Sequence, residues 1–392
     1  MWDMTENVVV LGAGYAGTGA INKLQSELGG NARLTWIADV DYHLVLHEAH
    51  RVIRDPDVRS DITFPTTQIA DPSTRFIQDE VTGLDIDEQV VELADGDDVE
   101  YDYVLVGLGS QTAYYGIPGL EEHSLTLKSL DDALEIHEAV SDASRDATRG
   151  EPAQVVIGGA GLSGIQTAGE IAEFRDEHRA PIEIHLVEAL EEIFPGNDPE
   201  IQQALRDLLE EAGVQIHTDD PITEATADHI EFDEGEPLDH DVLVWTGGIT
   251  GRDAMGNADL EKEHNRVNTG ANFQTSDECV FAIGDSAIID QGDQPAPPTA
   301  QAAWQAAEVA GENIARAIEN RPLRTWEHED KGTVVSVGEK AVAHDVKPAF
   351  GISLPVDTFG GLPAQNLKKM IAARWIADVT SWNEARKSWS SL

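Results

Sequence analysis

Two clusters of glycines have the spacing Gly-x-Gly-x-x-Gly, which suits the binding of a dinucleotide pyrophosphate. They comprise Gly12, Gly14 and Gly17, and then Gly159, Gly161 and Gly164. In such a turn the first glycine allows a sharp bend, the second lets the pyrophosphate approach the backbone, and the third lets a helix pack closely on a strand. The N-terminus of that helix then attracts the phosphate charge. Glycines also make purely structural turns. The strands and helices around each cluster must therefore show whether it binds a dinucleotide.

An acidic residue follows each glycine cluster at a distance that suits a ribose contact. Asp39 lies 22 residues past Gly17, and Glu188 lies 24 residues past Gly164. Carboxylates in this position accept hydrogen bonds from ribose hydroxyls. Glu188 also favours NADH over NADPH, because a carboxylate repels a 2′-phosphate. The alternative is that Glu188 is one more solvated acid in an acid-rich chain.

Each glycine cluster lies between a short buried strand and a helix, and each helix leads to a second strand. These strands are expected at 7–11 and 34–39, and again at 154–157 and 184–188. Strands alternating with helices predict an α/β fold with parallel sheets covered on both faces. Further strands are predicted at 103–106, 242–245, 280–283 and 333–337, and helices at 130–143, 199–212, 299–318 and 363–392.

The repeated unit predicts two Rossmann-like domains, the second inserted in the first, and a small C-terminal α+β and helical module. We expect a first domain from 1–114 and 246–325, a second from 115–245, and the terminal module at 326–392. Two dinucleotides imply electron transfer between them, and the usual pair is a tightly held flavin and a passing nicotinamide. The first domain should therefore bind FAD non-covalently, and the second should bind NADH.

The composition narrows the possible functions. The 392 residues contain 73 acidic and 26 basic side chains, for a formal charge of −47, and this excludes nucleic acid as a partner. The single cysteine, Cys279, excludes an internal disulfide and a cysteine-rich zinc site, and no metal cofactor is predicted. No apolar run reaches the ~18 residues of a membrane span. The first residues do not resemble a signal peptide, so we expect a cytoplasmic protein.

The acidic residues are spread along the whole chain, as in proteins from salt-accumulating halophiles. Self-repulsion of so large a charge is strong in dilute buffer and is screened in concentrated salt. We therefore expect the midpoint of thermal unfolding to fall steeply when molar KCl is replaced by millimolar KCl. Circular dichroism at the two salt concentrations tests this, and equal midpoints would indicate an ordinary acidic protein.

The order of motifs resembles the two-dinucleotide flavoprotein reductases and, within them, the type II NADH dehydrogenases, which are single-subunit NADH:quinone oxidoreductases. The resemblance runs over roughly residues 6–340. One stretch matches the Ala-Gln-x-x-x-Gln pattern that this family carries beside the flavin ring. The matching segments are Tyr42-His43-Leu44, Tyr101-Asp102-Tyr103 with Gly107-Leu108-Gly109-Ser110, Phe281-Ala282-Ile283-Gly284-Asp285, and Ala300-Gln301-Ala302-Ala303-Trp304-Gln305.

The resemblance implies an enzyme that takes hydride from NADH onto FAD and passes two electrons to a membrane quinone. Asp285 would bind the ribityl chain of the flavin, although an aspartate after an apolar strand could equally cap a helix. Gln301 and Gln305 are four residues apart and share one helix face, so their amides could bond a quinone carbonyl. They could also be plain polar residues of a packed helix. Further cofactor contacts are expected at Gly109, Gly248, Gly284, Thr299 and Ala300.

The chain departs from the family pattern in three places. Gln166 stands where these dehydrogenases usually carry glutamate, so a proton role is not carried over, although the amide could bond the nicotinamide. Alignment on Tyr42-His43 places the family's ribose acid on Ala38, one residue before Asp39. His47-Glu48-Ala49-His50 replaces a more apolar run near the flavin. His47 or Glu48 could therefore carry protons to the reduced quinone, with a surface or structural role as the alternative.

The end of the chain differs in charge from the rest. Residues 361–392 hold five basic and two acidic side chains, and three of the eight tryptophans. Basic residues beside tryptophans suit a helix that lies in the interface of an anionic membrane. The resemblance agrees, so we expect residues 363–392 to attach the protein to the inner face of the cell membrane. Self-packing and a homodimer contact are the alternatives. The apolar face would be formed by Leu367, Met370, Ile371, Trp375 and Val379.

Two other functions share nearly every motif. A soluble NAD(P)H-dependent reductase would pass electrons to a ferredoxin- or rubredoxin-like protein, and would carry a docking surface for it in place of an apolar tail. A flavoprotein similar to apoptosis-inducing factor would turn over slowly with every acceptor.

Overall fold

The computed structural model describes residues 5–347 and 356–392, and places the first glycine cluster at the end of a central strand of a five-stranded parallel sheet. The strand order is β21-β9-β1-β2-β5. Residues 8–11 of β1 are fully buried, as expected for a strand covered on both faces. The strands are β1 (Glu6–Leu11), β2 (Ala32–Ala38), β5 (Arg75–Gln78), β9 (Tyr103–Val106) and β21 (Val280–Ala282).

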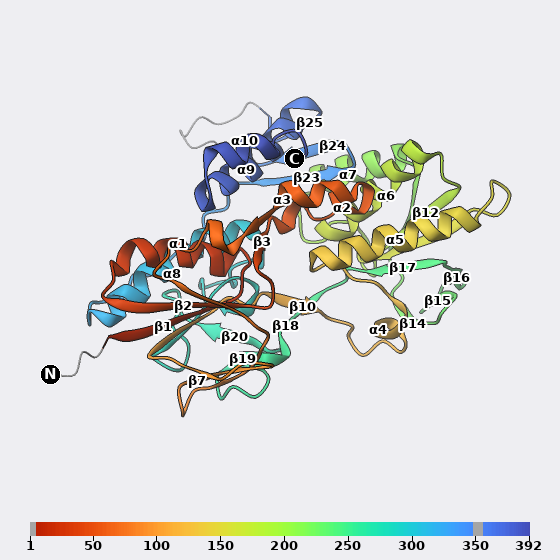
Figure 1. The fold of residues 1–392 in the computed structure, drawn as a ribbon. Coiled ribbons are helices and arrows are strands. Elements are labelled where there is room, and N and C mark those ends of the chain that lie inside the picture. The colour runs from red at the N-terminus through yellow and green to blue at the C-terminus, as the bar shows by residue number, and fades with distance from the viewer. Residues whose placement is uncertain (1–4, 348–355) are drawn as a thin grey trace.

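Strand β21 shows how the chain is divided. It pairs in parallel with β9, although a complete second sheet lies between them in the sequence. The chain leaves and re-enters the first unit through β10 (Ser110–Thr112) and β18 (Ile249–Gly251), which pair antiparallel between the two units (Figure 1). The predicted α/β fold, with one Rossmann-like unit inserted in the other, is confirmed. The boundaries at residues 114, 245 and 325 stay predictions.

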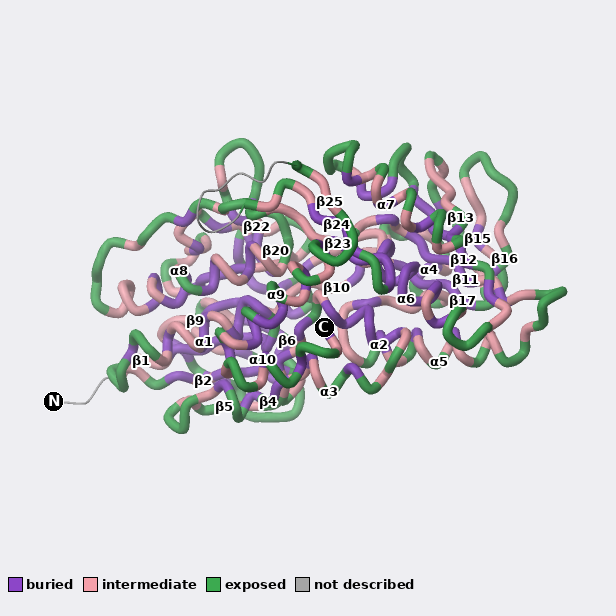
Figure 2. Tube along the Cα trace, turned by 90° about the horizontal axis from the view of Figure 1, so that it is seen from above, coloured by how far each residue is buried: buried purple, intermediate pink, exposed green. Residues whose placement is uncertain are grey.

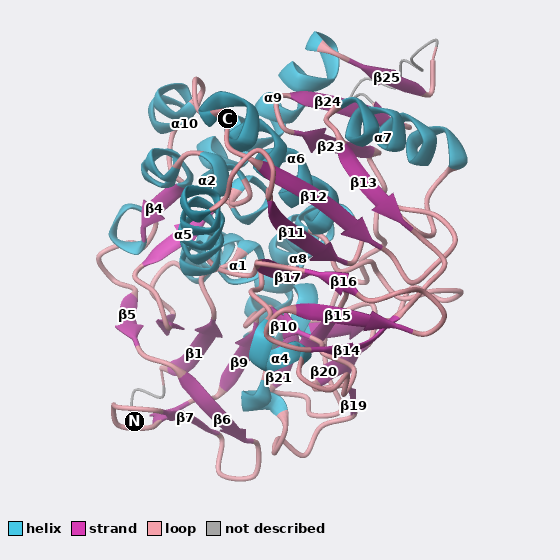
Figure 3. Ribbon diagram, turned by 90° about the vertical axis from the view of Figure 1, so that its right-hand side faces the viewer, coloured by secondary structure: helices cyan, strands magenta, loops and turns pink. Residues whose placement is uncertain are grey.

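The second sheet is also parallel and carries the second glycine cluster at the end of β11. Its order is β13-β12-β11-β17, and α6 and α7 lie beside these strands (Figure 3). Ser129 and Asp132 begin α5 with a reciprocal capping box, and Asp198 caps α7 ahead of a proline. The elements are β11 (Ala153–Gly158), β12 (Ile182–Val187), β13 (Val214–His217), β17 (Val242–Trp245), α5 (Leu130–Asp146), α6 (Leu162–His178) and α7 (Pro199–Glu211).

Two long helices of the first unit pack against each other, α1 (Tyr15–Leu28) and α8 (Ala300–Ile318). Small residues allow this approach, since a Cβ on Gly19 would lie 2.7 Å from the Cβ of Ala307. Thr299 begins α8 by accepting a hydrogen bond from the Ala302 N–H at 3.2 Å. Figure 2 shows the buried residues gathered inside both units, with exposed residues at the loops.

The C-terminal module lies over both units (Figure 1). Its three-stranded sheet packs on α6 through β23, and α9 packs on α1. This confirms the predicted strand and the terminal helical segment. Part of the module, residues 348–355, lies outside the described residues. The elements are β23 (Thr333–Val337), β24 (Lys340–His344), β25 (Thr358–Gly360), α9 (Leu362–Val379) and α10 (Trp382–Ser388).

The structure also contains short strands and short helices that the sequence analysis did not predict. Strands of two to five residues carry too few alternating positions to be recognised from their pattern. They are β3 (Tyr42–Leu44), β4 (Thr63–Pro65), β6 (Val81–Asp85), β7 (Val90–Leu93), β8 (Val99–Glu100), β14 (Ile222–Ala225), β15 (His229–Phe232), β16 (Leu238–Asp239), β19 (Lys262–Glu263), β20 (Arg266–Thr269) and β22 (Ala287–Ile289), with the short helices η1 (Leu46–Glu48), α2 (Arg51–Arg54), η2 (Pro56–Val58), α3 (Arg59–Ile62), η3 (Thr66–Gln68), α4 (Leu120–His123), η4 (Asp253–Met255) and η5 (Gly284–Ser286).

Candidate functional site

The first glycine turn has the geometry of a phosphate cradle. Gly12 has a φ of +96°, and a Cβ there would lie 2.3 Å from the Gly107 carbonyl oxygen. A Cβ on Gly17 would lie 1.9 Å from the Gly12 carbonyl oxygen, so α1 approaches β1 closely. Gly14 is the N-cap of α1, and no atom lies within 4 Å of a Cβ built on it. The space beside Gly14 is therefore open for a pyrophosphate at the N-terminus of α1.

The second glycine turn repeats this geometry. Gly159 has a φ of +92°, and a Cβ there would lie 2.6 Å from the Cα of Gly247. A Cβ on Gly164 would lie 1.9 Å from the Gly159 carbonyl oxygen. Gly161 is the N-cap of α6 and faces open space. In both turns the space beside the middle glycine is therefore open, as the binding of a dinucleotide requires.

The contrast between Gly12 and Gly14 gives a testable pair of substitutions. Gly12→Ala should lower the free energy of unfolding by more than about 2 kcal/mol, because it combines a left-handed backbone with a clash. Gly14→Ala should change that free energy by less than about 1 kcal/mol and should purify with much less flavin. Chemical denaturation and the absorbance of released flavin measure both effects. Full flavin content in Gly14→Ala would mean that this turn is structural.

A cavity of about 300 Å³ extends from the first turn and gathers most of the residues expected to hold FAD. Gly12, Gly14, Asp39, Gly109 and Asp285 all line it. Gly284, with a φ of +67°, bends the chain just before Asp285, and Ser110 donates a hydrogen bond to the Asp285 carboxylate at 2.9 Å. The lining of this cavity also includes Lys128 and Arg252, whose cationic groups suit the phosphates of a dinucleotide. The sequence analysis missed both.

The residues expected to hold NADH lie around the second turn. The Glu188 carboxylate accepts hydrogen bonds from the N–H groups of Ala160, at 2.8 Å, and Leu190, at 3.1 Å. This fixes the carboxylate beside the glycine turn, where a ribose would lie. A Cβ on Gly248 would lie 1.9 Å from the hydroxyl of Tyr115, so any larger residue there would displace the Tyr115 side chain. Tyr115 is exposed and covers this edge of the cradle.

A second cavity, also of about 300 Å³, lies between the first unit and the C-terminal module. It begins at Tyr15, the residue after Gly14, and reaches Ile371 and Arg374 on α9. Most of its wall is apolar, and the Arg374 guanidinium lies 5.7 Å from the centre of the Trp304 ring. The wall comprises Tyr15, His47, Ala300, Gln301, Trp304, Gln305, Glu308, Lys331, Gly332, Val334, Val346, Leu367, Ile371 and Arg374.

Gln301 and Gln305 line this second cavity, but their amides already have partners. Gln301 donates to the Gly332 carbonyl at 3.2 Å and accepts from the Lys331 N–H at 2.9 Å. Gln305 makes the same pair of bonds with the backbone of Glu329, at 2.8 and 3.1 Å. Both side chains therefore fix the loop that closes one side of the cavity. Thr299 caps α8, and Ala300, the first residue of that helix, lies in the wall of the cavity.

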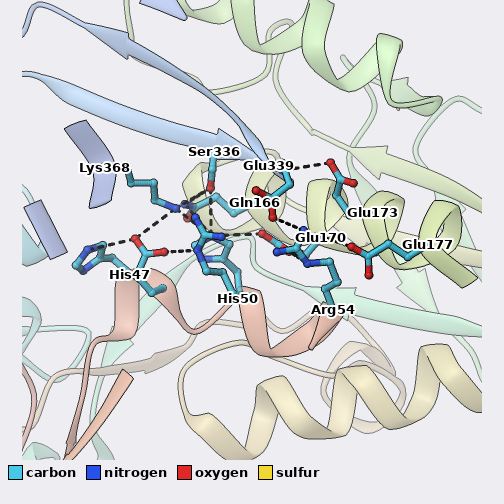
Figure 4. Close-up of polar contacts among 12 residues, drawn as sticks. His47, His50, Arg54, Gln166, Glu170, Glu173, Glu177, Ser336, Glu339 and Lys368 are labelled. Atoms are coloured by element: carbon cyan, nitrogen blue, oxygen red, sulfur yellow. Dashed lines mark hydrogen bonds and ion pairs between the residues drawn. The ribbon is translucent and has the colours of Figure 1, made fainter. Parts of the chain in front are cut away.

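Gln166, two residues past Gly164 on α6, and Glu48 lie in a buried polar cluster that joins the two units to the C-terminal module; Figure 4 shows Gln166 in it. The Glu48 carboxylate bonds the Arg51 Nε at 2.6 Å and lies 3.5 Å from the Lys368 Nζ. Lys368 donates to the Ser336 hydroxyl at 2.7 Å and to the His50 Nε2 at 3.0 Å. The Gln166 amide donates to the same hydroxyl at 3.2 Å.

Burial and neighbouring charges shift the pKa values in this cluster. Burial would raise the pKa of Glu48, but Lys368 and Arg51 outweigh it and lower that pKa to about 2. Burial lowers the pKa of Lys368 to about 8 in spite of Glu48. Burial raises the pKa of Glu170, whose carboxylate faces Arg54 at 3.3 Å, to about 7. The cluster therefore holds groups that can exchange protons near neutral pH.

A sequence profile described as pyridine nucleotide-disulphide oxidoreductase matches residues 6–307, which is most of the chain and includes both glycine turns. The chain belongs to that family. Its single cysteine, Cys279, separates it from the family members that use an internal redox disulphide.

Relatives within the family are similar over nearly their full length. A type II NADH:quinone oxidoreductase of Staphylococcus saprophyticus is 28% identical over 94% of each chain. The structure of NDH2 from Plasmodium falciparum in complex with NADH matches with a TM-score of 0.82 at 15% identity, over 99% of this chain and 97% of that one. The sulfide:quinone oxidoreductase of Aquifex aeolicus matches with a TM-score of 0.79 at 19% identity, over 97% and 92%. At these identities the structural matches concern the fold.

The sequence analysis missed several residues of the two cavities and of the buried polar cluster. Tyr15 follows the glycine turn directly, and Lys128 is one of only nine lysines in an acidic chain, so both carried a signal. Ser336 and Glu170 carried none, because their partners are distant in the sequence.

On the surface, Asp198, Glu200 and His344 bring three potential metal ligands within 4.8 Å of one another. Exposed groups of this kind are common without a metal.

Proposed function

We propose that the protein oxidises NADH through a bound FAD and passes two electrons to a membrane quinone. The observation that carries this proposal is the second cavity, which starts beside the first glycine turn at Tyr15 and is walled by apolar side chains. Such a cavity suits a flat, apolar electron acceptor better than the polar surface of a redox protein. The relatives named type II NADH:quinone oxidoreductase, which align over 94% of the chain, support the same function.

The chain's own residues fit both cofactors. We assign FAD to the domain of residues 1–114 and 246–325, with its pyrophosphate at Gly12, Gly14 and Gly17 and its ribityl chain near Asp285. FAD accepts a hydride and gives up two electrons. We assign NADH to residues 115–245, where Gly159, Gly161 and Gly164 form the cradle, with Gly248 as a further contact just past this segment. In this proposal Asp39 and Glu188 orient the two riboses.

The start of α8 contributes electrostatically. Thr299 caps this helix, and Ala300 opens it in the wall of the second cavity, so the positive end of the helix dipole lies at the cavity. That dipole stabilises negative charge that develops on an acceptor during reduction. Gln301 and Gln305 hold the loop at 329–332 against the cavity, so in this proposal they shape the quinone site, and their amides already bond that loop.

Glu188 should set the preference for NADH. Glu188→Gln keeps an oxygen for the Ala160 N–H but removes the charge that repels a 2′-phosphate, so kcat/KM for NADPH relative to NADH should rise about tenfold. Steady-state rates with the two nucleotides measure the ratio. Glu191→Ala, an exposed neighbour, is the matched control and should leave the ratio unchanged. An unchanged ratio in Glu188→Gln would leave this residue only a role in the turn.

The predicted membrane-facing surface of α9 needs correction. Trp375 and Val379 pack into the core, and Lys368 lies in the buried cluster. Large apolar side chains that the end of the chain does expose are Leu362, Met370 and Ile371 on α9, Trp382 on α10 and Trp389 just after it. Among the described residues, no helix has the length and apolarity to cross a bilayer.

We propose that this revised set, with the exposed cations Arg374 and Lys387, attaches the protein to the cytoplasmic face of the cell membrane. Ile371 belongs both to this surface and to the wall of the second cavity, so a quinone could enter from the lipid. Co-sedimentation with anionic liposomes in molar KCl tests the proposal. Leu362→Ser with Trp382→Ser should abolish binding without loss of fold, and full binding by this variant would contradict it.

The function itself is tested with the full chain purified in molar KCl. Bound FAD is first confirmed by absorbance, and NADH oxidation is then followed with and without a short-chain quinone. Fast oxidation that depends on the quinone is the expected result. Flavin that NADH reduces and the quinone fails to reoxidise would overturn the proposal and favour a protein acceptor. Slow turnover with every acceptor would instead favour a function like that of apoptosis-inducing factor.

A further inference from the structure

Exposed apolar side chains surround the second glycine turn. In the described part of the chain, four large apolar side chains outside the C-terminal module are exposed. Leu46 lines the first cavity, and the other three, Tyr115, Leu162 and Leu190, lie at the second turn. Leu162 is the first residue of α6, directly after Gly161. Apolar side chains gathered at an open cradle indicate contacts that the bound ligand completes.

Leu190 and Tyr115 lie on opposite sides of this turn. The Leu190 N–H donates to Glu188 beside the end of β12, whereas the Tyr115 hydroxyl donates at 3.3 Å to the Gly247 carbonyl, which follows β17. Strands β12 and β17 flank β11, which carries the turn (Figure 3). In such a sheet the adenosine half of a dinucleotide lies beside the strand with the ribose acid. The nicotinamide half therefore extends to the β17 side, where Tyr115 lies.

The segment that carries Tyr115 also connects the second turn to the first unit. Tyr115 lies shortly after β10, which pairs with β18 between the two units (Figure 1). Gly109, just before β10, lines the first cavity, and the Ala113 N–H donates to the Gly248 carbonyl at 3.2 Å. A nicotinamide beside Tyr115 therefore lies on the side of the cradle toward the proposed flavin cavity, as hydride transfer requires.

Tyr115 has a backbone conformation that is unfavourable for its residue type. Its φ is +53°, the φ of Gly116 is +69°, and the Ile117 N–H closes a tight turn on the Tyr114 carbonyl at 3.0 Å. Glycine or asparagine is preferred where such a turn needs a positive φ. The Tyr115 side chain is 69% exposed, so its burial in the free protein does little to offset this strain. Strain of this kind is concentrated at ligand sites.

We propose that Tyr115 binds the nicotinamide half of NADH through its aromatic ring, and that Leu190 contacts the adenine at the other end. The proposal rests on the proposed function, because it takes NADH as the ligand of the second turn. An aromatic ring packs well on the flat nicotinamide. This contact offsets the strain at Tyr115 only when the nucleotide is bound. The ring thereby holds the nicotinamide in position for transfer of its hydride.

Two non-reacting nucleotides separate the two ends of the site. NAD⁺ carries both halves and gives no hydride to oxidised flavin, whereas ADP-ribose lacks the nicotinamide. Titration calorimetry of the full-length protein with oxidised FAD measures both dissociation constants. The variants are Tyr115→Asn, which suits the left-handed turn, Tyr115→Phe, which keeps the ring, and Leu190→Ser. Gln89→Asn, at a left-handed position in the first unit, is the matched control and should change neither constant.

We expect Tyr115→Asn to weaken NAD⁺ binding about tenfold and to leave ADP-ribose binding within twofold of the unmodified protein. Tyr115→Phe should bind NAD⁺ within twofold of normal, because the ring makes the contact. Leu190→Ser should weaken both nucleotides by the same factor, and unchanged binding would overturn the contact with adenine. In turnover, Tyr115→Asn should raise KM for NADH about tenfold and leave kcat within twofold.

Thermal unfolding separates a binding role of Tyr115 from a structural one. Asparagine suits a left-handed position better than tyrosine, so Tyr115→Asn should keep or raise the midpoint of unfolding in the absence of nucleotide. Saturating NAD⁺ should raise the midpoint of the unmodified protein more than that of the variant. Tyr115→Gly, which carries no penalty for a positive φ, replaces Tyr115→Asn in every comparison if that variant fails to fold.

Three outcomes would overturn the assignment of Tyr115. NAD⁺ binding within twofold of normal in Tyr115→Asn would show that the ring makes no contact. Equal losses of NAD⁺ and ADP-ribose binding would show that the substitution disturbs the whole turn. Tyr115→Phe as weak as Tyr115→Asn would assign the effect to the hydroxyl. An unmodified protein that binds neither nucleotide would instead overturn the proposed function, so the two failures are distinguishable.

Discussion

Glu48→Gln should lower the free energy of unfolding by about 3–5 kcal/mol, as removal of one partner from a buried ion pair does. Glu48 is fully buried and is the counter-ion of both Lys368 and Arg51, which are themselves buried. Without its charge, two cations face each other in a medium that solvates them poorly. Urea denaturation at neutral pH in molar KCl measures the loss.

A second substitution separates this electrostatic effect from simple loss of packing. Lys368→Met in the Glu48→Gln background removes one uncompensated cation and should recover at least half of the lost stability. Glu319→Gln, at an exposed pair with Arg321, is the matched control and should cost less than about 1 kcal/mol. No recovery in the double variant would mean that the cost arises from shape rather than charge.

Glu48 also makes the free energy of unfolding depend on pH in the acidic range. The pKa of Glu48 is lowered from 4.5 to about 2 in the folded state, so its stabilising contribution is complete above pH 4.5 and is lost as pH falls from 4.5 towards 2. The stability of Glu48→Gln should therefore fall less over this interval than that of the unmodified protein. Parallel urea titrations at pH 5 and pH 3 compare the two slopes.

Trp375→Ala should also lower the free energy of unfolding, by about 3–5 kcal/mol, because it removes a large side chain from a packed interior. Trp375 is 1% exposed, and its ring centre lies 4.6 Å from that of Tyr15. Its indole N–H donates to the His43 Nε2 at 2.7 Å, and His43 in turn bonds the Ala13 carbonyl in the first glycine turn. The variant should therefore lose flavin as well as stability.

Trp382 is the natural control for Trp375. It begins the next helix, is 71% exposed, and its truncation to alanine should change stability by less than about 0.5 kcal/mol. The same change should weaken liposome binding, which Trp375→Ala should not do while folded. Equal effects of the two substitutions on stability would contradict the division of the C-terminal tryptophans into packed and exposed groups.

The glycine turns could be predicted because their chemistry is local. A left-handed glycine, an open glycine and a helix N-terminus lie within a few residues, and the neighbouring strands have an apolar pattern that is easily recognised. Gln301 and Gln305 show what local sequence patterns cannot predict. Their spacing correctly placed them on one side of α8, but their bonds to residues 329–332 come from a loop whose position no short pattern reveals.

The C-terminal helix could not be oriented from its sequence. The largest apolar residues of α9 fit one face, yet the surface that packs on the protein uses small residues as well, among them Ala364, Ala372 and Ala373. Alanines allow close approach of a neighbouring element, and apolar periodicity gives them little weight. Lys368 is one of the five basic residues of this segment that the sequence analysis expected at the membrane. Its burial could not be foreseen, because its counter-ion Glu48 is more than three hundred residues away in the sequence.

The position of the C-terminal module over both units has a consequence for how nucleotides arrive. Two domains joined only by the strands β10 and β18 would be expected to hinge. Here β23 packs on α6 of one unit, while the Trp375 N–H bonds His43 of the other, so the module holds both units in place. Movement of one unit away from the other would break the buried pairs of Arg54 with Glu170 and of Glu48 with Lys368. We therefore expect NADH to bind to units that are already in their final arrangement, without closure of one domain on the other.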